Sequence, residues 1–147
     1  MKLKTALSLL IFGTLGYFGY DTFTTHTSGE VMAYKNYAKA LLKNDKAAAQ
    51  KLVVDKTGLK PFDFHEKRMK AFRGGEIRFT YYQVLSQRYS TDRDRVSMRI
   101  RQVSRIDPPD VESFFGTEVV KQIHVVDMEK EKSAWKVTRF HDDAYRP

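Results

Sequence analysis

Residues 95–101 read RVSMRIR, a stretch in which polar and apolar side chains alternate strictly. Alternation with a period of two is typical of a β-strand that has one buried and one exposed face. The same alternation occurs over residues 76–89, 117–128 and 134–141. The sequence therefore predicts four strands, the second at residues 95–106, and the short polar connections at residues 90–94 and 129–133 are suited to antiparallel hairpins.

Helical patterns come before the strands. Between residues 30 and 43 apolar side chains recur three or four positions apart, and an Ala-rich segment follows at residues 46–54. Asn44 and Asp45 end the first helix, and Asp45 can cap the second. A third short helix is expected at residues 62–72. This order predicts an α+β domain in which two to three helices pack on one face of a curved four-stranded antiparallel sheet.

An uncharged, largely apolar run of 16 residues, from 5 to 20, directly follows Lys2 and Lys4. Basic residues before such a run keep the N-terminus in the cytoplasm. As a helix the run is about 24 Å long, and a snorkelling Lys4 can extend it toward the roughly 30 Å of a bilayer core. We therefore expect residues 1–29 to form a single-pass anchor and tether in the inner (cytoplasmic) membrane, with residues 30–147 as an extracytoplasmic domain.

The same segment has alternative interpretations. A signal peptide would release the domain as a secreted protein, although residues 27–29 make a poor cleavage site because no A-x-A motif is present. A buried core helix is disfavoured because no charged residue interrupts the run. Gly13, Gly16 and Gly19 would let a second helix approach closely, so the chain could also form a homo-oligomer through this segment.

Composition narrows the chemistry. The chain of 147 residues has no cysteine, which excludes a disulfide framework and a thiolate metal site. Its net charge of +8 is uneven: residues 66–105 carry eleven basic and four acidic side chains, and residues 106–134 carry three and seven. No phosphate-binding loop, dinucleotide fingerprint, serine-hydrolase motif or zinc-protease motif occurs. We expect no cofactor and no metal site.

A series of arginines is the most distinctive feature of the predicted strands. Because residues i, i+2 and i+4 of a strand line one face, Arg95, Arg99 and Arg101 should project together, and Arg78 can join them from the first strand. Such a patch would suit lipid headgroups, an acidic protein face or nucleic acid, and an extracytoplasmic location disfavours nucleic acid. The alternative is a solvated sheet face whose arginines pair with neighbouring acidic side chains.

The connection at residues 106–116 is expected to contribute to the same surface. Two prolines at residues 108–109 stiffen it, and Phe114 and Phe115 offer apolar anchors of the kind that carry binding energy at interfaces. The candidate binding residues are therefore Arg78, Arg95, Arg99, Arg101, Phe114 and Phe115. The expected partner is another protein of the bacterial envelope.

The order of elements resembles the nuclear transport factor 2-like superfamily, also called cystatin-like or SnoaL-like cones. Residues 38–49, AKALLKNDKAAA, look like the family's long helix, residue pair and Ala-rich helix. Residues 131–140, EKSAWKVTRF, look like its closing hairpin, with Trp135 near the start of the last strand, and we expect Trp135 to be largely buried. The resemblance covers residues 30–141 and implies a cone-like domain.

The superfamily hosts isomerases, hydrolases, binding proteins and scaffolds, among them a membrane-anchored scaffold subunit of type IV secretion systems, so the fold does not decide the function. In its enzymes, an Asp or His inside the cone acts as general base and a Tyr or Asp as oxyanion donor. Here the resemblance points to His124 and Asp127 with Tyr81 or Tyr82, and the alternative is a polar histidine on a sheet face. The other histidines, His26, His65 and His141, are not spaced along the sequence as metal ligands usually are. We expect a membrane-anchored accessory or scaffold protein, with an enzymatic or ligand-binding cone, isomerase- or hydratase-like, as the alternative.

Overall fold

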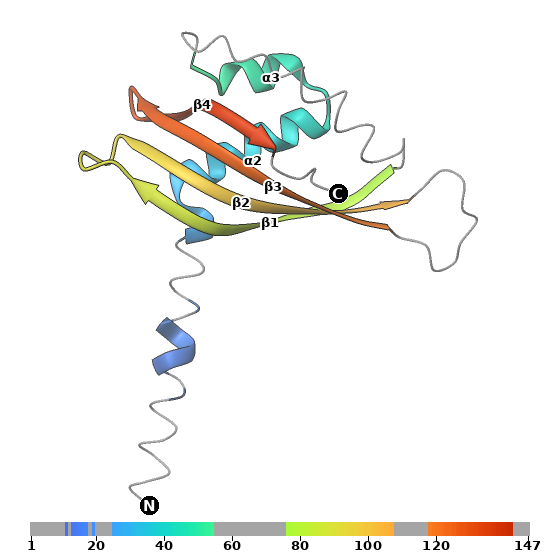
Figure 1. Ribbon diagram of the computed structural model, residues 1–147, viewed down its shortest axis with the longest axis horizontal. Coiled ribbons are helices and arrows are strands. Elements are labelled where there is room, and N and C mark those ends of the chain that lie inside the picture. The colour runs from blue at the N-terminus through green and yellow to red at the C-terminus, as the bar shows by residue number, and fades with distance from the viewer. Residues whose placement is uncertain are drawn as a thin grey trace, which may run out of the picture.

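The computed structural model (Figure 1) describes residues 11, 13–17, 19, 25–54, 76–107 and 118–142. Within residues 29–142, the described elements are two helices followed by four strands. They are α2 (Gly29–Leu42), α3 (Lys46–Lys51), β1 (Glu76–Tyr89), β2 (Arg95–Asp107), β3 (Glu118–Glu131) and β4 (Ala134–Asp142). The α+β class and the four-stranded antiparallel sheet are thus confirmed, and the helices come first in the chain as predicted.

Several predictions concern residues outside the described ranges. These are most of the anchor, the third helix at residues 62–72 and the connection with Phe114 and Phe115. Across the part of the chain that the structure describes, no helix has both the length and the apolar character needed to cross a bilayer.

The strands follow one another across the sheet in the order β1-β2-β3-β4, and each pairs antiparallel with the next. The connection between β3 and β4 is shorter than predicted, because β3 continues to Glu131, which pairs with Ala134. The two residues between them, Lys132 and Ser133, have φ angles of 49° and 74°. Positive φ at both positions is the geometry of a tight two-residue hairpin turn, which usually carries Asn or Gly. The hairpin was predicted from its polar connection, but without Asn or Gly the sequence carried no signal for a turn of only two residues.

The boundary between the two helices lies at Asn44 and Asp45, as predicted. Ser28 precedes α2 without a side-chain capping hydrogen bond, and Glu30 lies in the first turn. Asn44, with a φ angle of 55°, ends α2 in the left-handed conformation that often closes helices. Asp45 caps α3, as predicted, by accepting a hydrogen bond of 3.0 Å from the Ala48 N–H.

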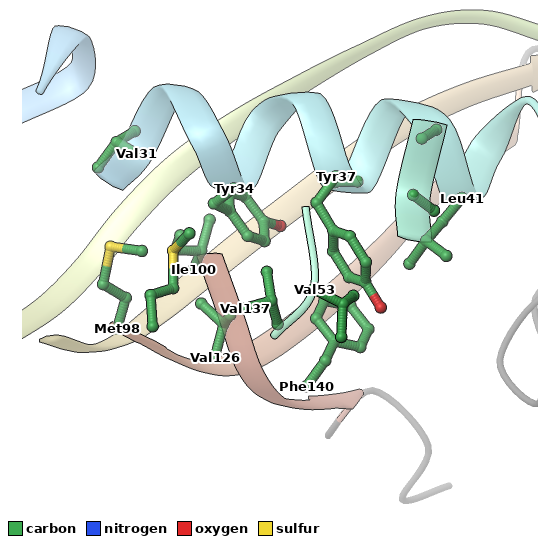
Figure 2. Close-up of a cluster of buried hydrophobic side chains, with 14 of the residues drawn as sticks. Val31, Tyr34, Tyr37, Leu41, Val53, Met98, Ile100, Val126, Val137 and Phe140 are labelled. Atoms are coloured by element: carbon green, nitrogen blue, oxygen red, sulfur yellow. The ribbon is translucent and has the colours of Figure 1, made fainter. Parts of the chain in front are cut away.

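The hydrophobic core lies between α2, α3 and one face of the sheet (Figure 2). One side of α2 is fully buried and consists of Val31, Tyr34, Tyr37, Ala38 and Leu41. The sheet meets it with Met98, Ile100, Val126, Val137 and Phe140. Trp135 is only partly buried, contrary to expectation, because it packs at the margin of the core against Gly29, the first residue of α2.

Alternation along β2 separates two faces of the sheet. The inner face, toward the helices, carries Val96, Met98, Ile100, Gln102, Ser104 and Ile106, all buried. The outer face carries the intervening residues, and among these Arg95, Ser97, Arg99 and Arg105 are exposed. Because α2 and α3 both pack on the inner side, neither of them covers the outer face.

Candidate functional site

Four arginines of β2 form a row on the outer face: Arg95, Arg99, Arg101 and Arg105. The prediction that Arg95, Arg99 and Arg101 share one face is therefore correct, since a strand places alternate side chains on the same side. Adjacent strands add further basic side chains. In the sheet register Arg88 of β1 lies opposite Ser97, and Lys121 of β3 lies opposite Val103.

Acidic neighbours occur at one end of the arginine row only: Arg95 lies opposite Glu129 and, after the hydrogen bond from Ser90, helps to lower the pKa of Asp92, whereas Arg99, Arg101 and Arg105 face no acidic residue on the adjacent strands. Within the described residues, none of its four members forms an ion pair with a carboxylate. Arg101 Nη1 donates to Gln83 Oε1 at 3.3 Å, and the guanidinium of Arg105 lies 5.6 Å from the centroid of the Phe79 ring. These contacts orient the side chains but leave their charge for another partner.

Arg78 does not belong to this row. The pairing of β1 with β2 is irregular between Ile77 and Phe79, so Arg78 has no direct partner on β2. A bulge of this kind re-aims a side chain. Arg78 forms an ion pair with Asp107 and lines a hollow beside α2. A bulge has no clear signature in this sequence, so the alternation alone misplaced Arg78.

Apolar side chains lie beside one end of the arginine row. Phe79 and Tyr81 of β1 stack with ring centroids 5.9 Å apart and remain 47% and 49% exposed. Val119 of β3, opposite Arg105, is 46% exposed. Phe114 and Phe115 belong to the connection between β2 and β3, which leaves the sheet at this same end but lies outside the described residues.

Acidic side chains are grouped at the other end of the outer face. Asp127 of β3 accepts from Arg139 of β4 at 2.6 Å, so this acid is paired locally. Asp127 also lines a hollow of about 400 Å³ together with Arg88 and Arg95. The outer face therefore combines a basic centre with one apolar end and one end of mixed charge.

His124 lies on the inner face and is fully buried. The hydroxyl of Tyr34 in α2 and Nδ1 of His124 are hydrogen bonded at 2.6 Å. On the other side of the ring, His124 Nε2 is 3.8 Å from Asp142 Oδ2, and Gln122 donates to the same oxygen at 2.9 Å. Gln102 donates in turn to Gln122 at 3.0 Å. The chain of polar contacts thus continues across the sheet beneath α2.

This environment differs from the catalytic arrangement that the resemblance implied. Asp127 and Tyr81 belong to the outer face, and His124 lines neither of the two hollows described here. Tyr82 lies on the inner side, its ring edge-on to Tyr34 at 5.6 Å. The partners of His124 were missed because Tyr34 is 90 residues away in sequence and occupies an apolar position of the α2 pattern.

A second buried polar group is Glu30, in the first turn of α2. Its carboxylate accepts hydrogen bonds from the Tyr89 hydroxyl and, at 2.6 Å, from Gln87 Nε2. Burial raises the pKa of Glu30, but the hydrogen bonds from Tyr89, the backbone, Ser28 and Gln87 together outweigh it, so the pKa lies below its ordinary value of 4.5. Partial burial and the bond to Glu30 raise the pKa of Tyr89 to about 12. These contacts tie the start of α2 to the end of β1.

Glu30→Gln is expected to lower the free energy of unfolding by about 1–3 kcal/mol at pH 7, because the charge-assisted hydrogen bonds are weakened. Since the folded pKa is depressed, this contribution is complete above about pH 4.5 and is lost as pH falls through the lower folded value. Urea unfolding at pH 7 and pH 3.5 measures both effects, with Glu76→Gln, at the exposed first residue of β1, as the control. A difference from wild type that does not shrink at the lower pH would contradict the assignment.

The remaining histidines provide no metal site in the described part of the chain, where no cluster of three or more suitable ligands occurs. The backbone carbonyl of His26 accepts a hydrogen bond from Lys35 at 2.8 Å. His141 pairs with Val125 on the outer side of β4. His65 lies outside the described residues.

Comparison with known proteins finds no matching protein family and no matching curated protein. Among solved structures, Aln2 from a Streptomyces species is similar with a TM-score of 0.58 and 10% identity, over 78% of this chain and 88% of that one. An NTF-2-like protein of unknown function from Shewanella oneidensis gives a TM-score of 0.48 and 12% identity, over 76% and 93%. Aln2 therefore shares with this chain the predicted α+β arrangement, in which helices pack on one face of a four-stranded antiparallel sheet, and the likeness is one of fold alone.

Proposed function

We propose that this chain is a membrane-anchored accessory protein of the bacterial envelope that binds an acidic surface of another protein through the outer face of its sheet. The observation that supports the proposal is the arginine row, which lies on a face that α2 and α3 leave uncovered and has no carboxylate partner among the described residues. Arginine suits such a contact because its planar fork binds a carboxylate through two hydrogen bonds.

The composition of the face favours a protein over other anionic partners. Arginine and tyrosine are enriched where protein interfaces bind most strongly, and here the arginine row adjoins the exposed rings of Phe79 and Tyr81. A second copy of the chain is a poor occupant, because a symmetric contact through this face would set arginines against arginines. The predicted extracytoplasmic location disfavours nucleic acid.

A binding role is favoured over catalysis at His124. A general base must come within hydrogen-bonding reach of the proton that it removes. His124 is fully buried, is hydrogen bonded to Tyr34 and lines neither described hollow. It is better explained as a core histidine whose hydrogen bonding is satisfied.

The experiment that tests the proposal places a photo-crosslinking amino acid at Ser97, which is exposed between Arg95 and Arg99. The control position is Gln50 of α3, which is also exposed but lies on the helical side. In native membranes with the full chain, we expect a discrete adduct from position 97 that weakens as salt rises, and none from position 50. Mass spectrometry should identify a partner with an acidic surface. Adducts of equal strength from both positions, or none from position 97, would refute the proposal.

The anchor is tested separately. If residues 1–29 remain attached, the protein should stay in the membrane fraction after carbonate or high-salt washing, and intact-mass analysis should find the full chain. The physical reason is the uncharged run at residues 5–20, which a bilayer core retains. A mature N-terminus near Glu30 would contradict the anchor and would mean that the domain is secreted after cleavage of a signal peptide.

A further inference from the structure

A hollow of about 540 Å³ lies between the last turns of α2 and the first half of β1. Leu42 of α2 and Ile77, Phe79 and Tyr82 of β1 give it largely apolar walls. Its volume is within the roughly 300–1,000 Å³ of small-molecule sites. It is separate from the arginine row, although Phe79 borders both.

The course of α2 explains why the hollow is there. At its first turn α2 is held against the end of β1 by the hydrogen bonds of Glu30 with Gln87 and Tyr89. Beyond that, α2 packs against α3 and β4, which lie toward the opposite edge of the sheet from β1. The helix and β1 therefore diverge, and among the residues that the structure describes no helix lies above the first half of β1.

The rim of the hollow is basic. Lys39 of α2 and Lys43, the residue that follows α2, lie one helical turn apart, and both are exposed. Neither forms an ion pair with an acidic side chain within the described residues. Arg78 also lines the hollow, but Asp107 neutralises it. Two positive charges with no ion-pair partner among the described residues thus lie beside apolar walls, an arrangement that favours an anionic ligand.

The hollow also presents one hydroxyl group from the sheet. Thr80 lines it, and the Thr80 and Ser104 hydroxyls are hydrogen bonded at 2.9 Å. Ser104 is fully buried and lies 3.5 Å from Gln102 Nε2, which donates toward it. The polar chain of the inner face therefore ends at Thr80, and when Ser104 donates to Thr80, the Thr80 O–H can donate to a ligand.

We propose that this hollow binds a small amphipathic anion, an aromatic or short alkyl carboxylate. Its apolar body would lie against Leu42, Ile77 and Tyr82, and its carboxylate would lie between Lys39 and Lys43. This inference is independent of protein binding at the outer face, because it uses neither the arginine row nor Ser97.

The test uses three probes that share one body and differ in charge: 4-phenylbutyrate, 4-phenylbutanol and 4-phenylbutylamine. The full chain, in nanodiscs of phosphatidylcholine, is titrated while the methyl NMR signals of Leu42, Ile77 and Thr80 are followed. We expect the acid to bind at least about tenfold more tightly than the amine, because one charge-assisted hydrogen bond changes an affinity by about that factor. The affinity of the alcohol should lie between the two.

Three variants separate charge from shape. Lys39→Glu with Lys43→Glu should weaken the acid at least about tenfold, strengthen the amine and change the alcohol less than about threefold. Lys51→Glu with Lys130→Glu makes the same change of net charge at exposed positions away from the hollow and should leave all three probes unaffected. Leu42→Trp should fill the hollow and abolish binding of all three.

Two results would overturn the inference. One is a folded chain whose three methyl signals do not respond to the acid. The other is an acid affinity that the paired lysine changes at positions 39 and 43 leave unaltered, in which case these lysines serve only the C-terminal end of α2. Neither result bears on crosslinking from position 97, so the two proposals can fail separately.

Discussion

Changing Arg99 and Arg101 together to glutamate is expected to abolish partner crosslinking from position 97, with a loss of affinity of at least about 100-fold. Arg99 and Arg101 are two residues apart on β2, so both side chains lie on the same face of the sheet. The change to glutamate reverses the charge at both positions and removes two guanidinium groups that can each bind a carboxylate through two hydrogen bonds. It also places negative charges against the acidic partner, and such like-charge contacts cost several kcal/mol at an interface. Changing both residues to lysine keeps the charge but loses the fork, so a weakening of about tenfold or less is expected.

The competing explanation is that the arginines only stabilise the sheet. That explanation predicts a lower melting temperature for the double glutamate variant and no loss specific to the partner. Binding predicts the reverse: a nearly unchanged melting temperature, since the arginine row has no ion-pair partner to lose in the described structure. Salt should also weaken the wild-type complex, because exposed charges are screened over about 8–10 Å near physiological ionic strength. A glutamate variant that folds normally and still binds the partner would rule out the arginine row as the contact.

Ile100→Ala is expected to lower the free energy of unfolding by about 2–5 kcal/mol, the usual cost of emptying a buried aliphatic site. Ile100 is fully buried on the inner face, where it packs with Tyr34 and Val126 in the central cluster (Figure 2). The loss is a large share of the roughly 5–15 kcal/mol that holds a typical domain folded. Urea unfolding followed by circular dichroism measures it.

Ile123→Ala is the matched control for the core. Ile123 lies on the next strand, on the outer face opposite Arg101, and is only partly buried. The same truncation there should cost only about 1 kcal/mol, since less apolar area is returned to water. Equal costs at both positions would mean that the two faces of the sheet had been assigned wrongly.

Alternation predicted the sheet well because it follows directly from strand geometry. The same rule, applied to the sequence alone, predicts that Arg95, Arg99 and Arg101 lie on one side of β2, as they do. It could not predict Arg78, because a bulge shifts the register by one residue and reverses the side on which a residue lies. The burial of Trp135 was overestimated for a related reason. A strand pattern indicates which face of the sheet a residue lies on, but not how far the residue lies from the margin of the core.

The polar contacts were beyond the reach of sequence patterns. Tyr34 reads as one apolar position of an amphipathic helix, yet its hydroxyl meets His124 across the core. Glu30 reads as a favourable charge at a helix start, yet it also binds Gln87 and Tyr89 of β1. Both pairings depend on the angle at which α2 crosses the sheet, which is set by packing against α3 and β4 and not by any local signal.

β1 is an edge strand of 14 residues, and among the described residues its only neighbour in the sheet is β2. A free edge of that length could template growth of the sheet from one molecule to the next. The pairing irregularities near Ile77 and Val84 divide β1 into shorter runs that do not present one flat ladder of backbone groups. If the proposed anchor holds many copies side by side on a membrane, their β1 edges cannot join without a break, which would protect the protein from fibrillar aggregation.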